Sequence, residues 1–121
     1  MVKMKTLVLG ASSNPERYSF VAMSRLLQNQ HEVIAIGLKN ESVFGIEIQK
    51  GFPVLDDIHT VTLYLNPQRQ KEYYKYVIEL TPKRVIFNPG TENPEFYDLL
   101  KKNNIIIEEA CTLVLLGTKQ Y

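Results

Sequence analysis

The sequence has 121 residues, of which 45% are hydrophobic and 22% are charged. This length and composition fit a single globular domain spanning residues 1–121 and exclude two full-sized domains. The 14 Lys and Arg residues nearly balance the 13 Asp and Glu residues, which gives a net charge of +1. No overall field therefore favours nucleic acid or an anionic membrane, and any phosphate site must be local.

Two further features of the sequence bear on where the protein works. Cys111 is the only cysteine, so it cannot form an internal disulfide, and this favours a reducing compartment. The apolar stretch Leu7-Val8-Leu9 near the start is too short for an export signal. No run approaches the roughly 18 apolar residues of a membrane helix. We expect a cytoplasmic protein.

Short apolar runs that alternate with longer amphipathic stretches predict a repeated strand-helix unit. Most of the runs are apolar at every position, as is typical of strands covered on both faces, so they favour a parallel sheet. The expected strands are Thr6 to Leu9, Val33 to Ile36, Val61 to Leu65, Val85 to Phe87 and Ile105 to Ile107.

Three of the longer stretches predict helices. The first runs from about Ser19 to Asn29 and places Phe20, Met23 and Leu27 on one face. The second begins at Asn66-Pro67 and ends before Pro82. The third begins at Asn93-Pro94 and ends at Asn103-Asn104. In both later segments, Asn is a capping residue and Pro occupies the first helical position.

This alternation predicts an α/β fold with three layers, a Rossmann-like doubly wound parallel sheet of about five strands in the order 3-2-1-4-5. The stretch from Lys39 to Asp57 departs from the pattern, and we expect a loop there with at most one small strand. The second crossover helix is then short or missing. In open sheets of this kind, ligands bind beyond the carboxyl ends of the strands at the switch point, here expected around strands 1 and 4.

The loop after the first strand reads Gly10-Ala11-Ser12-Ser13-Asn14-Pro15. A strand followed by small residues and then a helix lets backbone N–H groups approach a phosphate. An ordinary turn between a strand and a helix also favours small residues, so this alternative stays open. The dinucleotide motif G-x-G-x-x-G is absent, because Ser12 and Pro15 stand where its second and third glycines would be. An NAD-binding loop of the usual kind is therefore not expected.

Lys39 lies at the end of the second expected strand. NAD enzymes place an Asp or Glu there, which accepts hydrogen bonds from the adenosine ribose. A lysine favours instead a nucleotide with an extra phosphate on that ribose, either coenzyme A (CoA) or NADP. A solvated loop lysine is the alternative interpretation.

Three segments of the sequence together resemble the small single-domain CoA-binding proteins and the amino-terminal nucleotide-binding domain of the succinyl-CoA synthetase alpha subunit. They are Leu7 to Ser19, with its G-A-S loop and N-P-x-R-x-S run, His31 to Ile36 at the second strand, and Phe87 to Asn93 at the fourth strand exit. Cys111 also falls where many family members have a cysteine. The resemblance covers about Thr6 to Leu116.

The resemblance implies that CoA is the cofactor and that its phosphates lie near Gly10 to Ser13, with Lys39 approaching a phosphate. Tyr64 to Pro67 would border the adenine and ribose, and Gly90 and Thr91 would let the pantetheine arm pass. The full expected set is Gly10, Ala11, Ser12, Ser13, Asn14, Tyr18, Ser19, Lys39, Tyr64, Leu65, Asn66, Pro67, Asn88, Gly90, Thr91 and Cys111.

The sequence differs from the family pattern at two strand exits. Family members often have Asn-Pro after the second strand and an aromatic residue followed by Arg after the third. This chain has Gly37-Leu38-Lys39-Asn40 and Tyr64-Leu65-Asn66 instead. We therefore expect the third exit to lack a positive charge, and Asn66 has the alternative role of a helix cap.

The sequence offers few groups suited to catalysis. His31 and His59 lie before strands, away from the expected binding rim, and Asp56-Asp57-x-His59 lacks a further metal ligand at a supporting spacing. Cys111 is either a thiol near the CoA sulfur or a small buried hydrophobe, and we favour the second. We expect no metal and no catalytic residue.

The sequence thus predicts a non-catalytic protein that binds CoA or acyl-CoA as a small-molecule partner, with no nucleic acid and no membrane. Two alternatives stay open, an NADP-dependent oxidoreductase-like domain and a degenerate Rossmann scaffold for protein interaction. Association with a second copy or with another protein is also left open.

Overall fold

The computed structural model describes residues 3–121 of the chain. Its strands are β1 (Thr6–Ala11), β2 (Val33–Gly37), β3 (Glu41–Val43), β4 (Ile46–Gln49), β5 (Thr60–Leu63), β6 (Arg84–Phe87) and β7 (Ile106–Glu109). Its helices are α1 (Tyr18–Gln28), α2 (Pro67–Gln70), the 3₁₀ turn η1 (Lys71–Tyr73), α3 (Tyr74–Leu80), α4 (Pro94–Lys102) and α5 (Thr112–Gly117).

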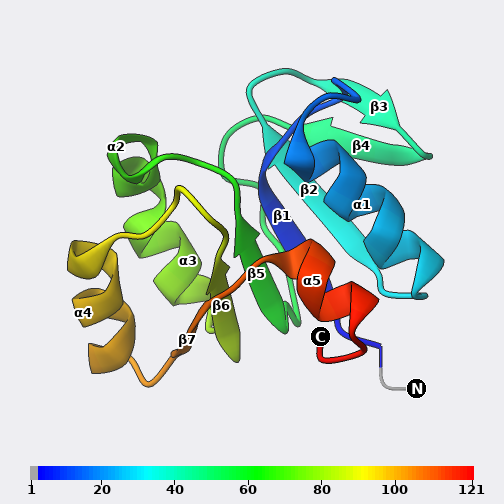
Figure 1. Ribbon diagram of the computed structural model, residues 1–121. Coiled ribbons are helices and arrows are strands. Elements are labelled where there is room, and N and C mark those ends of the chain that lie inside the picture. Colours follow the sequence, from blue (N-terminus) through cyan, green and yellow to red (C-terminus); the bar gives the residue numbers. More distant parts are fainter. Residues whose placement is uncertain (1–2) are drawn as a thin grey trace.

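All seven strands join one sheet in the order β3-β4-β2-β1-β5-β6-β7, and every neighbouring pair is parallel except β3 with β4. Helices α1 and α5 cover one face, and α2, α3 and α4 cover the other (Figure 1). The structure confirms the predicted α/β class with three layers and a mostly parallel sheet. None of the helices within residues 3–121 has the length and apolar character needed to cross a bilayer.

The predicted strand count and order are wrong. The segment from Lys39 to Asp57 contains a β-hairpin, and the second strand of this hairpin, β4, pairs parallel with β2. This strand occupies the place beside β2 that we expected for Val61 to Leu65, so β5 pairs with β1 instead. The switch point consequently lies between β1 and β5. No helix connects β2 with β4, in agreement with the predicted gap in the crossover pattern.

Helices α1 and α4 lie where the sequence predicts them. The second expected helix is divided into α2, η1 and α3. A 3₁₀ turn brings side chains three residues apart onto one side, and here both Gln70 and Tyr73 are buried. Helix α5, which the sequence did not indicate, follows Cys111 and packs beside α1.

The sheet separates two apolar cores. Val8 packs on the α1 side with Met23 and Leu26, whereas its neighbours Leu7 and Leu9 pack on the other side. All five side chains are almost completely buried. Because neighbouring side chains of a strand point to opposite faces, a strand covered on both faces must be apolar throughout, and this explains the uninterrupted run at β1.

Candidate functional site

A pocket of about 670 Å³ opens at the carboxyl ends of β1, β2 and β5. Its walls come from the loop between β1 and α1, the segment after β2, the turn from β5 into α2, and the loop after β6. This is the switch point of the sheet, where the crossovers on either side of β1 leave toward opposite faces and separate the loops.

Two glycines let the backbones meet closely at the bottom of this pocket. Gly10 has a φ of +100°, and a Cβ at this position would lie 2.9 Å from the carbonyl carbon of Tyr64. A Cβ on Gly37 would collide with the carbonyl oxygen of Ala11. The exits of β1, β2 and β5 are thus in contact through backbone atoms. A side chain at either glycine would force them apart.

The loop after β1 turns tightly into α1. The Asn14 N–H donates to Ser12 Oγ at 3.0 Å, and the Glu16 N–H donates to Asn14 Oδ1 at 3.0 Å. Helix α1 then begins after Arg17, which has the extended backbone of an N-cap residue but provides no side-chain acceptor. Its first turn also carries no acidic residue. The positive end of the α1 dipole is therefore not balanced by an acidic side chain of α1 itself.

The other helices that follow the sheet's carboxyl edge on the opposite face differ in this respect. Asn66 Oδ1 accepts from the Arg69 N–H at 2.9 Å at the start of α2, and Asn93 Oδ1 accepts from the Phe96 N–H at the start of α4. Both caps are those predicted from the Asn-Pro pairs. The uncapped start of α1 is the one that adjoins the loop after β1.

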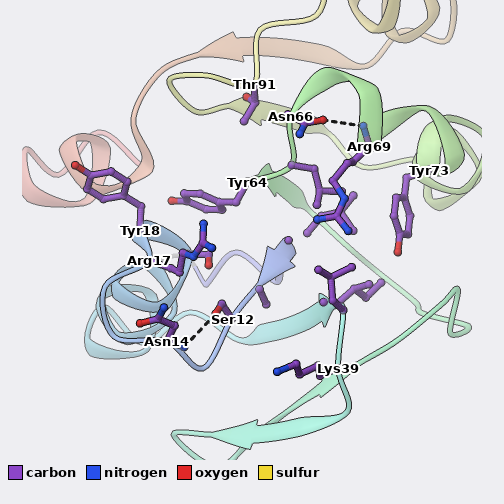
Figure 2. A pocket seen from close by; sticks show the side chains of 18 of the residues that line it. Ser12, Asn14, Arg17, Tyr18, Lys39, Tyr64, Asn66, Arg69, Tyr73 and Thr91 are labelled. Atoms are coloured by element: carbon purple, nitrogen blue, oxygen red, sulfur yellow. Dashed lines mark hydrogen bonds between the residues drawn. The ribbon is translucent and has the colours of Figure 1, made fainter.

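Three basic side chains line the pocket from three separate elements. Arg17 comes from the start of α1, Lys39 from the segment after β2, and Arg69 from α2. Figure 2 shows Arg69 directed into the pocket from the side opposite Arg17. The expectation that the third strand exit lacks a positive charge is wrong, because Arg69 supplies one three residues after Asn66.

Arg17 and Arg69 are absent from the predicted site, although the sequence contained a signal for each. Arg17 lies inside the N-P-x-R-x-S run on which the resemblance rests. Arg69 is the third residue after the predicted cap Asn66, so its position on the first helical turn could be anticipated.

A buried glutamine fixes the wall formed by α2 and the loop after β6. Gln70 Nε2 donates to the Leu65 and Thr91 carbonyl oxygens, each at 2.8 Å, and Gln70 Oε1 accepts from Asn93 Nδ2 at 2.9 Å. These bonds hold the β5 exit at a set distance from the β6 exit. Sequence reasoning missed Gln70 because a polar side chain on an amphipathic helix is normally assigned to the exposed face.

Most residues of the predicted set line the pocket. They are Gly10, Ala11, Ser12, Ser13, Asn14, Tyr18, Ser19, Lys39, Tyr64, Leu65, Asn66, Gly90 and Thr91. Pro67, Asn88 and Cys111 are not among the lining residues. Pro67 is the first residue of α2, and Cys111 is the N-cap residue of α5.

Asn88 lies beneath the pocket rim, buried in a polar network. Its Nδ2 donates to Thr62 Oγ1 at 2.7 Å and to the Leu63 carbonyl at 2.9 Å. Its Oδ1 accepts from the Thr112 N–H at 2.9 Å. The Asn88 amide is therefore engaged in attaching α5 to the sheet, which is a structural task that the sequence does not reveal.

Tyr64 has its ring on the Tyr18 side of the pocket, away from Arg69 (Figure 2). The ring packs against the apolar core beneath α1. Burial raises the pKa of Tyr64 to about 12, so the phenol is neutral at physiological pH. Tyr64 thus contributes an apolar surface and no charge to the site.

Both histidines lie at the amino-terminal ends of the strands, on the side of the sheet opposite the pocket. His31 precedes β2, where its Nδ1 accepts from the Met4 N–H at 3.0 Å, and His59 precedes β5 beside Thr60. Neither lines the pocket. Within residues 3–121 there is also no cluster of His, Cys, Asp or Glu able to hold a metal ion.

Comparison with known proteins adds to this description. In solved structures, a crystal structure of an uncharacterized protein is 45% identical and covers 100% of both chains, with a TM-score of 0.97. A hypothetical protein from Pyrococcus horikoshii OT3 is 27% identical over 98% of this chain and 84% of its own, with a TM-score of 0.87. Among curated proteins, none matched.

The sequence profile of the CoA binding domain family matches residues 4–117, nearly the whole length of the chain. The matched range includes every wall of the pocket, from the loop after β1 to the loop after β6. The chain therefore belongs to the CoA-binding domain family.

Proposed function

We propose that this protein binds CoA or acyl-CoA in the pocket at the carboxyl edge of the sheet, without catalysing a reaction on it. The observation that carries the proposal is that Arg17, Lys39 and Arg69 line one pocket together with Gly10, the loop after β1 and the uncapped start of α1. CoA carries a pyrophosphate and a ribose phosphate, and such groups bind to helix N-termini, backbone N–H groups and cations.

The electrostatic balance of the pocket supports an anionic ligand. The pocket is lined by three basic side chains and by two acidic ones, Glu41 and Glu72. Because the net charge of the whole chain is only +1, attraction for a phosphate depends on this local arrangement and not on the overall field. Tyr64, Leu65 and Tyr73 add apolar surface suited to the adenine ring and the pantetheine arm.

A binding role without catalysis is supported by the side chains that surround the ligand space. General acid-base or nucleophilic catalysis needs a nucleophile beside a base, or two carboxylates in different environments. The histidines lie at the amino-terminal ends of the strands, away from the pocket, and Cys111 is not among the lining residues. Glu41, one of the two lining carboxylates, accepts a hydrogen bond from Ser13.

Isothermal titration with CoA and acetyl-CoA tests the proposal. We expect saturable binding by the wild-type protein and a loss of affinity of at least about tenfold in Lys39→Glu, because the reversal replaces attraction of a phosphate by repulsion. Lys50→Glu is the matched control, since Lys50 is also an exposed lysine of the β2 to β5 segment but does not line the pocket. It should leave CoA affinity unchanged.

The absence of heat with CoA at millimolar concentration would refute CoA binding, and tighter binding of NADP than of CoA would favour the oxidoreductase alternative. Mass spectrometry of acetyl-CoA incubated with the protein tests the second part of the proposal. We expect the thioester to persist as it does in buffer, and turnover proportional to protein concentration would contradict a non-catalytic role.

A further inference from the structure

One acidic side chain of the pocket contacts the loop where a phosphate is expected. Ser13 Oγ donates a hydrogen bond of 2.8 Å to Glu41 Oε1. Glu41 is the first residue of β3, so the bond joins the loop after β1 to the hairpin that also follows Lys39. The same short segment thus presents both a cation and a carboxylate to the pocket.

The Glu41 carboxylate is not neutralised by an ion pair. The ion pairs within residues 3–121 join Lys5 to Glu32, Lys75 to Glu79, and Arg84 to Glu108, and none involves Glu41. Glu41 is partly buried at the pocket wall. An acidic side chain therefore lies beside the loop, where screening by solvent is incomplete.

The hydrogen bond also occupies the only proton that Ser13 can donate from its side chain. A phosphate that approaches this hydroxyl must replace a charge-assisted bond, which is stronger than a neutral one. It must in addition come close to a like charge. Both effects weaken phosphate binding without changing the shape of the pocket.

We infer that Glu41 is an affinity-limiting residue that competes with the ligand phosphate for Ser13 and keeps binding weaker than the three cations would allow. The inference rests on the proposed phosphate site at the loop. Its consequence is that ligand release is promoted by a group of the protein itself, since the carboxylate regains its hydrogen bond whenever the phosphate leaves.

The test compares wild type, Glu41→Gln and Glu47→Gln by isothermal titration with CoA and, separately, with inorganic pyrophosphate. Glutamine keeps an acceptor for the Ser13 hydroxyl, so the contact with the hairpin is preserved while the charge is removed. Glu47→Gln removes the same charge from β4 of the same hairpin, but Glu47 is exposed and does not line the pocket.

We expect Glu41→Gln to bind CoA about tenfold more tightly than wild type at low ionic strength, with a smaller difference at high salt. Glu47→Gln should match wild type. Unchanged or weaker binding by Glu41→Gln, or an equal gain in Glu47→Gln, would overturn the inference and leave CoA binding by the wild-type protein intact.

The pyrophosphate arm separates the two proposals. If neither wild type nor Glu41→Gln binds CoA but Glu41→Gln binds pyrophosphate more tightly, the competition stands and the CoA proposal fails. If neither protein binds either probe, both proposals fail. Circular dichroism and thermal melting of the unliganded variants establish that the compared proteins share the wild-type fold.

Discussion

Gly10, the second-last residue of β1, has a positive φ, and its position is crowded. The nearest atoms to a side-chain Cβ at this position would be the Tyr64 carbonyl carbon at 2.9 Å and oxygen at 3.1 Å. Tyr64 directly follows the central strand β5 and its N–H donates to the Leu9 carbonyl oxygen, so its backbone cannot move aside without shifting the end of β5. The cost of a side chain at Gly10 therefore has two parts, one from φ and one from overlap.

Gly90 allows the energetic cost of the positive φ to be separated from the cost of steric overlap. Its φ is +92°, close to that of Gly10, but no heavy atom lies within 4 Å of its Cβ position. We expect Gly90→Ala to lower the free energy of unfolding by about 1 kcal/mol through φ alone. Gly10→Ala should cost about 3 kcal/mol because overlap adds to the backbone strain. Urea denaturation measures both, and equal costs would contradict the close contact between β1 and β5.

At the scale of secondary structure, the start of α1 differs from that of a helix selected for stability alone. Arg17 has φ −87° and ψ 140°, the extended conformation in which Ser, Thr, Asp or Asn would accept a backbone hydrogen bond. An arginine cannot accept one. The structure thus places a cation that faces the pocket where a capping residue would stabilise the helix.

Arg17→Ser should consequently have opposite effects on stability and on binding. We expect the ligand-free protein to become more stable by about 0.5–1 kcal/mol through the new cap, while CoA affinity falls because a pocket cation is lost. Arg25→Ser, in the last turn of the same helix and outside the pocket lining, should not weaken CoA binding. Thermal melting and titration give the two readouts. A loss of stability in Arg17→Ser, or unchanged affinity, would contradict this account.

The elements differ in how far the sequence could predict them. The starts of α2 and α4 were predictable because Asn-Pro encodes the cap and the first helical position locally. The central strands were predictable because burial on both faces requires continuous apolar runs. These signals depend only on near neighbours in the chain.

The hairpin β3-β4 and the strand order were not predictable in this way. Residues Ile46 and Ile48 alternate with polar residues. This pattern fits a short isolated strand within a loop as well as a strand of the main sheet, which is what β4 forms beside β2. The choice depends on pairing with a distant segment. In the site, Lys39 could be found from its place at a strand exit, whereas the Glu41 contact and the buried Gln70 depend on the tertiary structure.

At the scale of the whole molecule, the two edges of the sheet have different tasks. The carboxyl edge is open and forms the pocket, while the amino edge is closed by packed aromatic and basic side chains. The Tyr121 hydroxyl lies 2.6 Å from Thr6 Oγ1, and the Tyr121 ring lies 4.9 Å from the His31 ring. The Arg84 guanidinium lies 4.4 Å from the centre of the Tyr121 ring. His31 is buried in this cluster.

The closed edge makes stability depend on pH. Burial, followed by the charge of Arg84, lowers the pKa of both His31 and His59 from the usual 6.5. The folded protein thus keeps both rings neutral where the unfolded chain takes up protons. The contribution of the two histidines to the free energy of unfolding is therefore fully present above pH 6.5. It decreases as the pH drops below this value.

We therefore expect the melting temperature to be lower at mildly acidic pH than at pH values above 6.5. The decrease should be smaller in His31→Asn, whose side-chain oxygen can still accept from the Met4 N–H. Scanning calorimetry across this range provides the measurement. A melting temperature that rises on acidification, or a decrease of the same size in the variant, would contradict the assignment of this dependence to His31.

The central claim is that CoA binds at the open carboxyl edge, against the loop after β1. Amide chemical shifts recorded by NMR during a CoA titration test it most directly, because they report on both edges of the sheet at once. The account predicts the largest changes at Gly10 to Asn14, Lys39 and Gly90, with little change at His31, His59 and Tyr121. Changes centred on the amino edge, or none at the loop after β1 under saturating CoA, would contradict it.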